Sequence, residues 1–99
     1  PIKIIVLNNE FLGMVRQWQE LFFDKRYAST RMVNPDFQKI VEGYDITTKK
    51  VSERTDLNAA VAEMMESKGA YFIEVKVGKE NNVFPMVPTG ASVSEIRLN

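Results

Sequence analysis

Ile2–Asn9 has the sequence IKIIVLNN, and its pattern indicates the fold class of this chain. Apart from Lys3, its first six residues are apolar and mostly β-branched, a pattern typical of a parallel strand buried on both faces. The apolar run stops at two asparagines, and an amphipathic helical pattern follows. In open α/β sheets, ligands bind just beyond the carboxyl ends of such strands. We therefore expect Asn8 and Asn9 to lie at the ligand-binding edge of a parallel sheet.

An asparagine pair at this edge supports two interpretations. The amide oxygen is a neutral, hard ligand suited to Mg²⁺ or Ca²⁺, and carbonyl oxygens of the following loop can add to it. The alternative is a turn followed by a helix N-cap, because asparagine favours both positions. For an arbitrary Asn-Asn pair, the residues alone favour the turn.

The rest of the chain alternates helical and strand patterns, which predicts a parallel sheet. The predicted elements are a helix that fades by Asp24–Lys25, a loop over 24–34, a helix from Asn34–Pro35 to Gly43, a short strand near Lys49–Val51, a helix that begins between Ser52 and Thr55, and a strand over Ala70–Val77. Asn34 is the predicted N-cap of its helix. Gly69 is predicted to be left-handed at the end of the last helix.

Helical and strand periods also predict which faces are buried. In the first helix, one apolar stripe holds Phe11, Val15, Trp18 and Phe22, and the polar residues Arg16, Gln17, Gln19 and Glu20 lie mostly opposite it. In the last helix, the predicted core face is Leu57, Ala60, Val61, Met64 and Met65. The last strand is predicted to have one packed face and one partly wet face. We interpret Arg16, Lys25 and Arg26 as solvated surface charges.

Composition excludes several classes of function. Thirteen basic residues balance 13 acidic ones, so the charge favours neither nucleic acid nor an anionic membrane as a partner. The longest apolar run is far too short for a membrane span. The chain has no cysteine and no histidine, which argues against thiol catalysis and against a self-contained zinc or hydrolase site. The lack of cysteine fits a reducing compartment, and we expect the cytoplasm.

Four segments carry a resemblance to a known family: NN at 8–9, LGMVRQWQELF at 12–22, KRY at 25–27 and NVFPMVP at 82–88. Together they resemble the catalytic subunit of acetohydroxyacid synthases (acetolactate synthases), and the resemblance runs over essentially the whole chain. It implies a three-layer α/β/α fold with a flavodoxin-like parallel sheet. Residues 1–77 would be the C-terminal part of the diphosphate-binding domain, and residues 78–99 an irregular tail. We expect an excised piece of a larger protein.

The resemblance implies a metal site. In thiamine-diphosphate enzymes, an Asp of a Gly-Asp-Gly motif, the second Asn of an Asn-Asn pair and a carbonyl two residues later hold the Mg²⁺ that binds the diphosphate. The matching positions are the Asn9 side chain and the Phe11 carbonyl. No Gly-Asp-Gly occurs in these 99 residues. Because Mg²⁺ releases its waters reluctantly, we expect this chain alone to bind thiamine diphosphate weakly or not at all.

The resemblance also places Leu12, Gly13 and Met14 at the cofactor, and Met14 and Trp18 in the substrate access channel. Each position has a structural alternative. Gly13 either allows a close backbone approach or only begins a helix. Met14 and Trp18 are apolar residues at helical spacing, which also suits a core. Nothing in this chain matches the catalytic Glu of the family, so no residue is assigned a catalytic role.

The intact enzyme would decarboxylate pyruvate on thiamine diphosphate and join the two-carbon unit to a second 2-ketoacid in branched-chain amino-acid biosynthesis. The implied partners are these ketoacids, the rest of the catalytic subunit, further copies in a homo-oligomer and a regulatory small subunit. FAD would bind through a domain absent here. The alternatives are another thiamine-diphosphate decarboxylase or carboligase, and a non-catalytic flavodoxin-like binding module.

Overall fold

The computed structural model describes all residues 1–99 as two compact units. Pro1–Phe11 and Met32–Lys79 form the first unit, and Leu12–Arg31 and Glu80–Asn99 form the second. The first unit therefore contains the sheet, and the second contains the first helix and the C-terminal segment.

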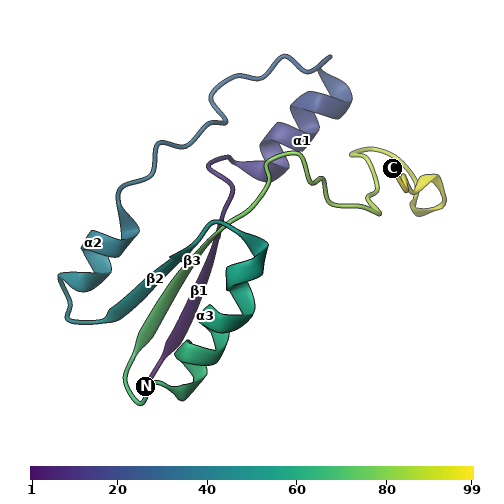
Figure 1. Ribbon diagram of the computed structural model, residues 1–99. Coiled ribbons are helices and arrows are strands. Elements are labelled where there is room, and N and C mark those ends of the chain that lie inside the picture. Colours follow the sequence, from purple (N-terminus) through teal and green to yellow (C-terminus); the bar gives the residue numbers. More distant parts are fainter. The chain divides into compact units, whose positions relative to one another are not determined.

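The first unit is built on a three-stranded parallel sheet in the order β1-β3-β2 (Figure 1). The strands are β1 (Lys3–Asn8), β2 (Thr47–Val51) and β3 (Tyr71–Lys76). The helices of this unit are α2 (Phe37–Glu42) and α3 (Arg54–Glu66), which begins within the range that the sequence predicts. The predicted α/β class and parallel sheet are confirmed, and β2 starts two residues earlier than the short strand predicted near Lys49–Val51.

Helices pack on opposite faces of this sheet. Successive side chains of a strand point to opposite faces, so Tyr71 and Ile73 of β3 share one face and Phe72 points to the other. Residues of α3 pack with Tyr71 and Ile73, whereas the ring of Phe37 in α2 lies 6.5 Å from the ring of Phe72. The unit consequently has the three layers that the family resemblance implies.

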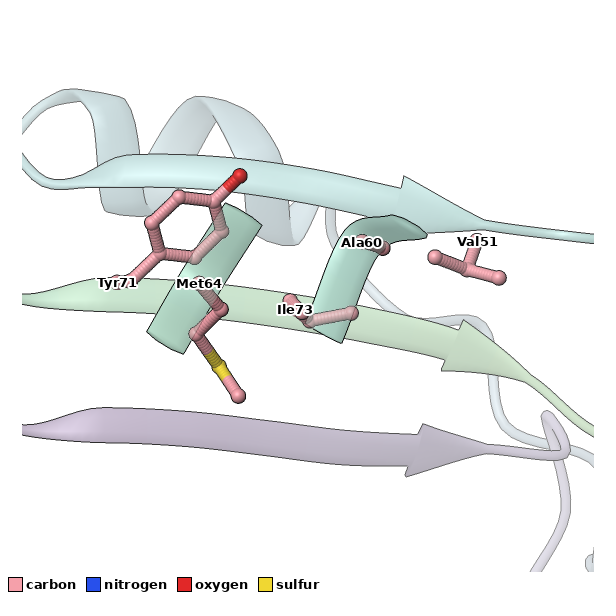
Figure 2. Packing of buried hydrophobic residues seen from close by; sticks show 5 residues of the cluster. All are labelled: Val51, Ala60, Met64, Tyr71 and Ile73. Atoms are coloured by element: carbon pink, nitrogen blue, oxygen red, sulfur yellow. The ribbon is translucent and has the colours of Figure 1, made fainter. Parts of the chain in front are cut away.

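The hydrophobic core lies between α3 and the sheet (Figure 2). Its buried members are Val51, Ala60, Met64, Tyr71 and Ile73, and Leu57, Val61 and Val75 pack against them. Ala60 and Ile73 are fully inaccessible to solvent, so a small residue on the helix meets a branched one on the central strand. Met65 was predicted in this core, and that prediction is wrong. Its side chain is 68% exposed, because one residue beyond Met64 the helix has turned away from the sheet.

The burial of two strands differs from the prediction. β1 was expected to be buried on both faces, but it is an edge strand, and Ile4, Ile5 and Leu7 are exposed. Conversely, β3 has no wet face over Tyr71–Glu74, because β1 and β2 flank it and helices pack above and below. Strand order thus decides burial, and local periodicity cannot supply strand order.

Two helix boundaries also differ from the prediction. The N-cap of α2 is Asp36, whose Oδ1 accepts a hydrogen bond from the Lys39 amide at 3.2 Å, and Asn34 lies before it with another role. Gly43 ends α2 as predicted. Gly69 does not adopt a left-handed conformation, because α3 already ends at Glu66 and leaves through Ser67 in an extended conformation.

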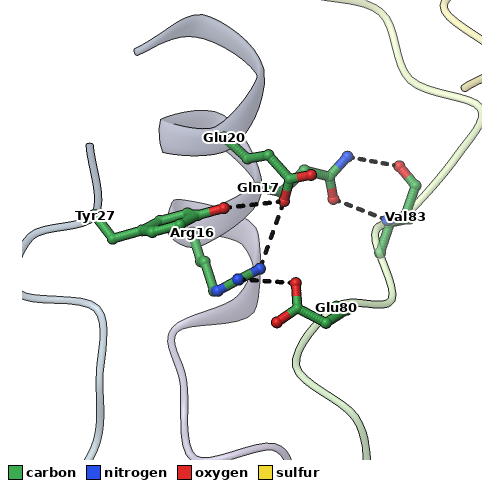
Figure 3. A network of polar contacts seen from close by, with 6 residues as sticks. All are labelled: Arg16, Gln17, Glu20, Tyr27, Glu80 and Val83. Carbon is green, nitrogen blue, oxygen red and sulfur yellow. Dashed lines mark hydrogen bonds and ion pairs between the residues drawn. The ribbon is translucent and has the colours of Figure 1, made fainter. Parts of the chain in front are cut away.

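In the second unit, α1 (Gly13–Phe22) packs its polar side against the C-terminal segment. Arg16 and Gln17 are buried, whereas Met14, Val15 and Phe22 are exposed, which reverses the predicted burial. Figure 3 shows the reason: Gln17 exchanges two hydrogen bonds with the backbone of Val83, at 2.9 and 2.8 Å. The rest of the segment is irregular except for one bridge, Met86 with Arg97, and the 3-10 helix Val93–Glu95.

Arg16 is not the solvated surface charge that the sequence predicts. Its Nη2 lies 2.9 Å from Glu80 and its Nη1 lies 3.5 Å from Glu20, and its guanidinium stacks 4.4 Å from the centre of the Tyr27 ring (Figure 3). The charge is therefore neutralised within the unit, which allows the side chain to be buried. None of the helices is both long enough and apolar enough to cross a bilayer.

Candidate functional site

Two consecutive turns follow the carboxyl end of β1. The Asn8 Oδ1 accepts a hydrogen bond from the Glu10 amide at 2.9 Å, and the Asn9 Oδ1 accepts one from the Phe11 amide at 3.0 Å. Between them, Glu10 is left-handed, with φ of 59°. Asn8 and Asn9 therefore form Asx turns, and the predicted helix N-cap is wrong. The N-cap of α1 is Leu12, which makes no side-chain capping bond.

The Asn9 turn is compatible with a magnesium ligand. An amide oxygen has two lone pairs, and the bond from Phe11 uses one of them. The same bond keeps the Phe11 backbone next to the Asn9 side chain, so an amide oxygen and a carbonyl oxygen belong to one short loop. Oxygen donors of this kind suit Mg²⁺, but both are neutral. The chain has no cluster of three or more His, Cys, Asp or Glu side chains that could hold a metal. The loop itself therefore offers neutral oxygens and no negative charge to a cation.

A buried carboxylate lies directly behind the turn. Glu74 of β3 is 3% exposed, and its Oε1 accepts a hydrogen bond from the Asn8 Nδ2 at 2.7 Å. The Lys50 ammonium lies 3.5 Å from its Oε2. Burial alone raises the pKa of Glu74, but the amides of Asn8 and Gln38 and the charge of Lys50 outweigh this, and the pKa is lowered. Glu74 is thus ionised and can only accept hydrogen bonds.

Asn34 closes the other side of this network. Its Nδ2 donates to the Asn8 Oδ1 at 2.9 Å, so this oxygen accepts from both Asn34 and Glu10. Asn34, which was predicted to cap α2, instead connects the loop before α2 to the end of β1. The Gln38 Nε2 is buried and close enough to Glu74 to lower the pKa of its carboxyl, although the two groups do not reach hydrogen-bond geometry. Asn8 is held from three directions, and its neighbour Asn9 is positioned as a result.

The predicted cofactor and channel residues belong to the second unit. Leu12 donates its amide to the Thr30 carbonyl at 2.8 Å, and Gly13 is the first residue of α1. Met14 is 53% exposed, so the alternative that it fills a core is wrong within this unit. Met14 and Trp18 line an apolar hollow of about 330 Å³ with Val15, Gln19 and Phe23. The Trp18 ring also meets Phe22 edge to face, with 5.8 Å between ring centres.

Sequence reasoning missed Glu74, Gln17 and Asn34 as residues that organise these loops. For Glu74 a signal existed, because a charged residue interrupts the apolar run YFIEV in the middle of a predicted strand. A charge in that position is buried only when it has partners. For Gln17 no signal existed, since its partner Val83 is 66 residues away in a segment without periodicity.

The chain matches the family model "Thiamine pyrophosphate enzyme, C-terminal TPP binding domain" over residues 1–75. It belongs to this family. The sheet, the Asx turns and the Glu74 network of the first unit all lie within the matched residues or at their limit. Thiamine pyrophosphate is the same compound as thiamine diphosphate, so the predicted cofactor class of the domain is confirmed.

Curated relatives of this thiamine pyrophosphate domain are acetolactate synthases. The "Acetolactate synthase isozyme 2 large subunit" of Escherichia coli is 42% identical over 97 residues, which are 97% of this chain and 18% of that protein. The mitochondrial acetolactate synthase of Schizosaccharomyces pombe is 40% identical over 99 residues, or 100% of this chain and 15% of that protein. The mitochondrial acetolactate synthase catalytic subunit of Saccharomyces cerevisiae is 42% identical over 95 residues, which are 96% of this chain and 14% of that protein. The chain thus spans less than a fifth of the length of these relatives.

Proposed function

We propose that this chain forms part of the cofactor site of an acetolactate synthase. In this proposal, residues 1–77 belong to the diphosphate-binding domain and residues 78–99 form its C-terminal tail. The Asn9 amide oxygen and the Phe11 carbonyl are two of the Mg²⁺ ligands. Leu12, Gly13 and Met14 lie beside the cofactor, and Met14 and Trp18 form part of the wall of the acceptor channel.

The observation that carries this proposal is the Asx turn of Asn9 at the carboxyl end of β1. It presents one side-chain oxygen and one backbone segment at the sheet edge where α/β proteins bind ligands. Identity of about 40% to named acetolactate synthases, over nearly the whole chain, supports the choice among thiamine-diphosphate enzymes. The exposed Met14 and the hollow beside Trp18 support an apolar channel wall.

Thiamine diphosphate, when bound, supplies the electron sink for decarboxylation of a 2-ketoacid. The residues of this chain bind and orient. Asn9 and Phe11 contribute neutral oxygens, which need the negative charge of the diphosphate to complete the shell. The Trp18 ring adds apolar contact area for the acceptor, worth roughly 1–3 kcal/mol between acceptors that differ by one methylene. The proposed partners are pyruvate, a second 2-ketoacid, the rest of the catalytic subunit, further copies of it and a regulatory subunit. FAD and a cytoplasmic location belong to the same proposal.

The test uses the protein at its full natural length. Asn9→Ala is expected to raise the half-saturating Mg²⁺ concentration for thiamine diphosphate binding at least tenfold, because it removes a direct ligand. Binding is followed by isothermal titration calorimetry of thiamine diphosphate at a series of Mg²⁺ concentrations. Asn58→Ala, at an exposed position of α3, is the matched control and should bind as the unmodified protein does. Equal Mg²⁺ requirements for the two variants would exclude Asn9 as a ligand.

The second measurement separates the proposed enzyme from its alternatives. Acetolactate formation from pyruvate by the full-length protein supports acetolactate synthase, whereas decarboxylation without carbon–carbon bond formation points to another thiamine-diphosphate enzyme. The 99-residue chain by itself is expected to bind thiamine diphosphate weakly, since its magnesium donors are neutral. Tight binding by this chain alone would contradict the proposed division of ligands.

A further inference from the structure

Glu74 has no role in the metal shell described above, yet its burial requires an explanation. It lies in the central strand β3 and is 3% exposed. An ionised carboxylate in such a place is costly unless hydrogen bonds and charge compensate it. Asn8 and Lys50 compensate it here, at 2.7 and 3.5 Å. The sheet therefore retains a buried charge directly behind the loop that presents Asn9.

The direction of the hydrogen bonds follows from this charge. An ionised carboxylate accepts and never donates, so Asn8 must turn its NH₂ group towards Glu74. The Asn8 Oδ1 must then point the opposite way, where it accepts from the Glu10 amide and from the Asn34 Nδ2, both at 2.9 Å. If the amide were reversed, its NH₂ would face the N–H donors of Glu10 and Asn34. The first Asx turn would then be lost.

We propose that Glu74 is a positioning residue that acts through Asn8 on the Asn9 turn, and so sets the affinity of the site for its divalent cation. The inference rests on the proposed function, because it takes Asn9 as the metal ligand. Glu74 does not touch the ion. It fixes the orientation of the Asn8 amide, which stabilises the left-handed Glu10, and the chain then leaves β1 in the direction that presents Asn9.

The central variant is Glu74→Gln, which keeps the shape and loses the obligatory acceptor. In the full-length protein, the half-saturating Mg²⁺ concentration for thiamine diphosphate binding is expected to rise roughly 10–100-fold, as for other partners of metal ligands. In the metal-free protein, amide exchange at Glu10 should speed up about tenfold, since one net hydrogen bond is lost. The control is Glu63→Gln on α3, a carboxylate that also pairs with a β2 lysine, Lys49, but on the opposite face of the sheet.

Exchanging the carboxylate and the amide between positions 74 and 8 distinguishes a positioning role from a general loss of stability. Asn8→Asp alone sets two carboxylates against each other and should also weaken Mg²⁺ binding. In the double variant Asn8→Asp with Glu74→Gln, the glutamine donates to the aspartate, and the second aspartate oxygen still accepts from Glu10 and Asn34. The double variant should therefore bind Mg²⁺ more tightly than either single variant. A role in stability alone would change the melting temperature and leave the Mg²⁺ requirement of the folded protein unchanged.

The outcomes distinguish this inference from the proposed function. If Asn9→Ala weakens Mg²⁺ binding but Glu74→Gln behaves like Glu63→Gln, the positioning role is wrong and the ligand role of Asn9 stands. If Asn9→Ala has no effect, both are wrong. Weakening by Glu74→Gln and by Asn8→Asp, with recovery in the double variant, supports both.

Discussion

Gln17 offers the sharpest test of how the second unit is held together. It is 1% exposed, and its Nε2 donates to the Val83 carbonyl while its Oε1 accepts from the Val83 amide. Gln17→Glu keeps the shape and the acceptor but replaces the donor with a charged oxygen that faces a carbonyl. When the new side chain is protonated, its hydroxyl can donate again. The variant is therefore expected to destabilise the attachment of the C-terminal segment at neutral pH and to recover in acid.

The magnitude follows from the contacts. Loss of one partner of a buried hydrogen bond costs roughly 1–3 kcal/mol. A cost of about 2 kcal/mol corresponds to a roughly 30-fold larger population of molecules in which the C-terminal segment is detached from α1. Hydrogen exchange at the Val83 amide measures this population, after correction for the intrinsic pH dependence of exchange. Exchange should be about 30-fold faster at pH 7 and should return towards the unmodified rate as the buried carboxyl takes up a proton above the usual pKa of about 4.3.

The chain provides a matched control. Gln19 makes the same pair of hydrogen bonds with Ala28, but in a more exposed position. Its Nε2 donates to the Ala28 carbonyl at 2.9 Å, and its Oε1 accepts from the Ala28 amide at 3.2 Å. Gln19→Glu should leave exchange at Val83 unchanged. If both variants accelerate exchange at Val83 equally, or if acid does not reverse the effect of Gln17→Glu, the reasoning is refuted.

Two further predictions concern the first unit. Burial and the hydrogen bond to Glu63 raise the pKa of Tyr71 to about 12, whereas tyrosine in an unfolded chain titrates near 10. As the pH rises, this tyrosine loses its proton first in the unfolded state, so the free energy of unfolding should fall between about pH 10 and pH 12. Urea titrations at several pH values measure this fall. Tyr71→Phe should remove it, whereas Tyr44→Phe, at an exposed position, should not. The second prediction concerns the β1 edge, which is apolar and unpaired, so the 99-residue chain should self-associate at tens of micromolar. Light scattering measures this association. Ile5→Lys should reduce it, whereas Thr47→Lys on the β2 edge should not. A monomeric unmodified chain at that concentration would contradict the second prediction.

Much of the first unit could be predicted from the sequence, because its signals are local. The apolar run before Asn8 and the spacing of Leu57, Ala60, Val61 and Met64 identify a strand and a helix by period alone. Asn8 and Asn9 mark the turn by their residue type. Asn34 shows where local reasoning fails, since Asn before Pro is a good helix start, yet Asp36 caps the helix and Asn34 bonds to Asn8, 26 residues away.

Residue type and spacing along the chain identify the strands and helices, the parallel sheet and the turn after β1. Which faces are buried depends instead on how these elements pack together. β3 is central and therefore buries Glu74, while β1 is an edge and leaves Ile5 exposed. Likewise α1 buries Gln17 and exposes Met14, because a buried amide is stable wherever a distant backbone satisfies both of its hydrogen-bonding groups.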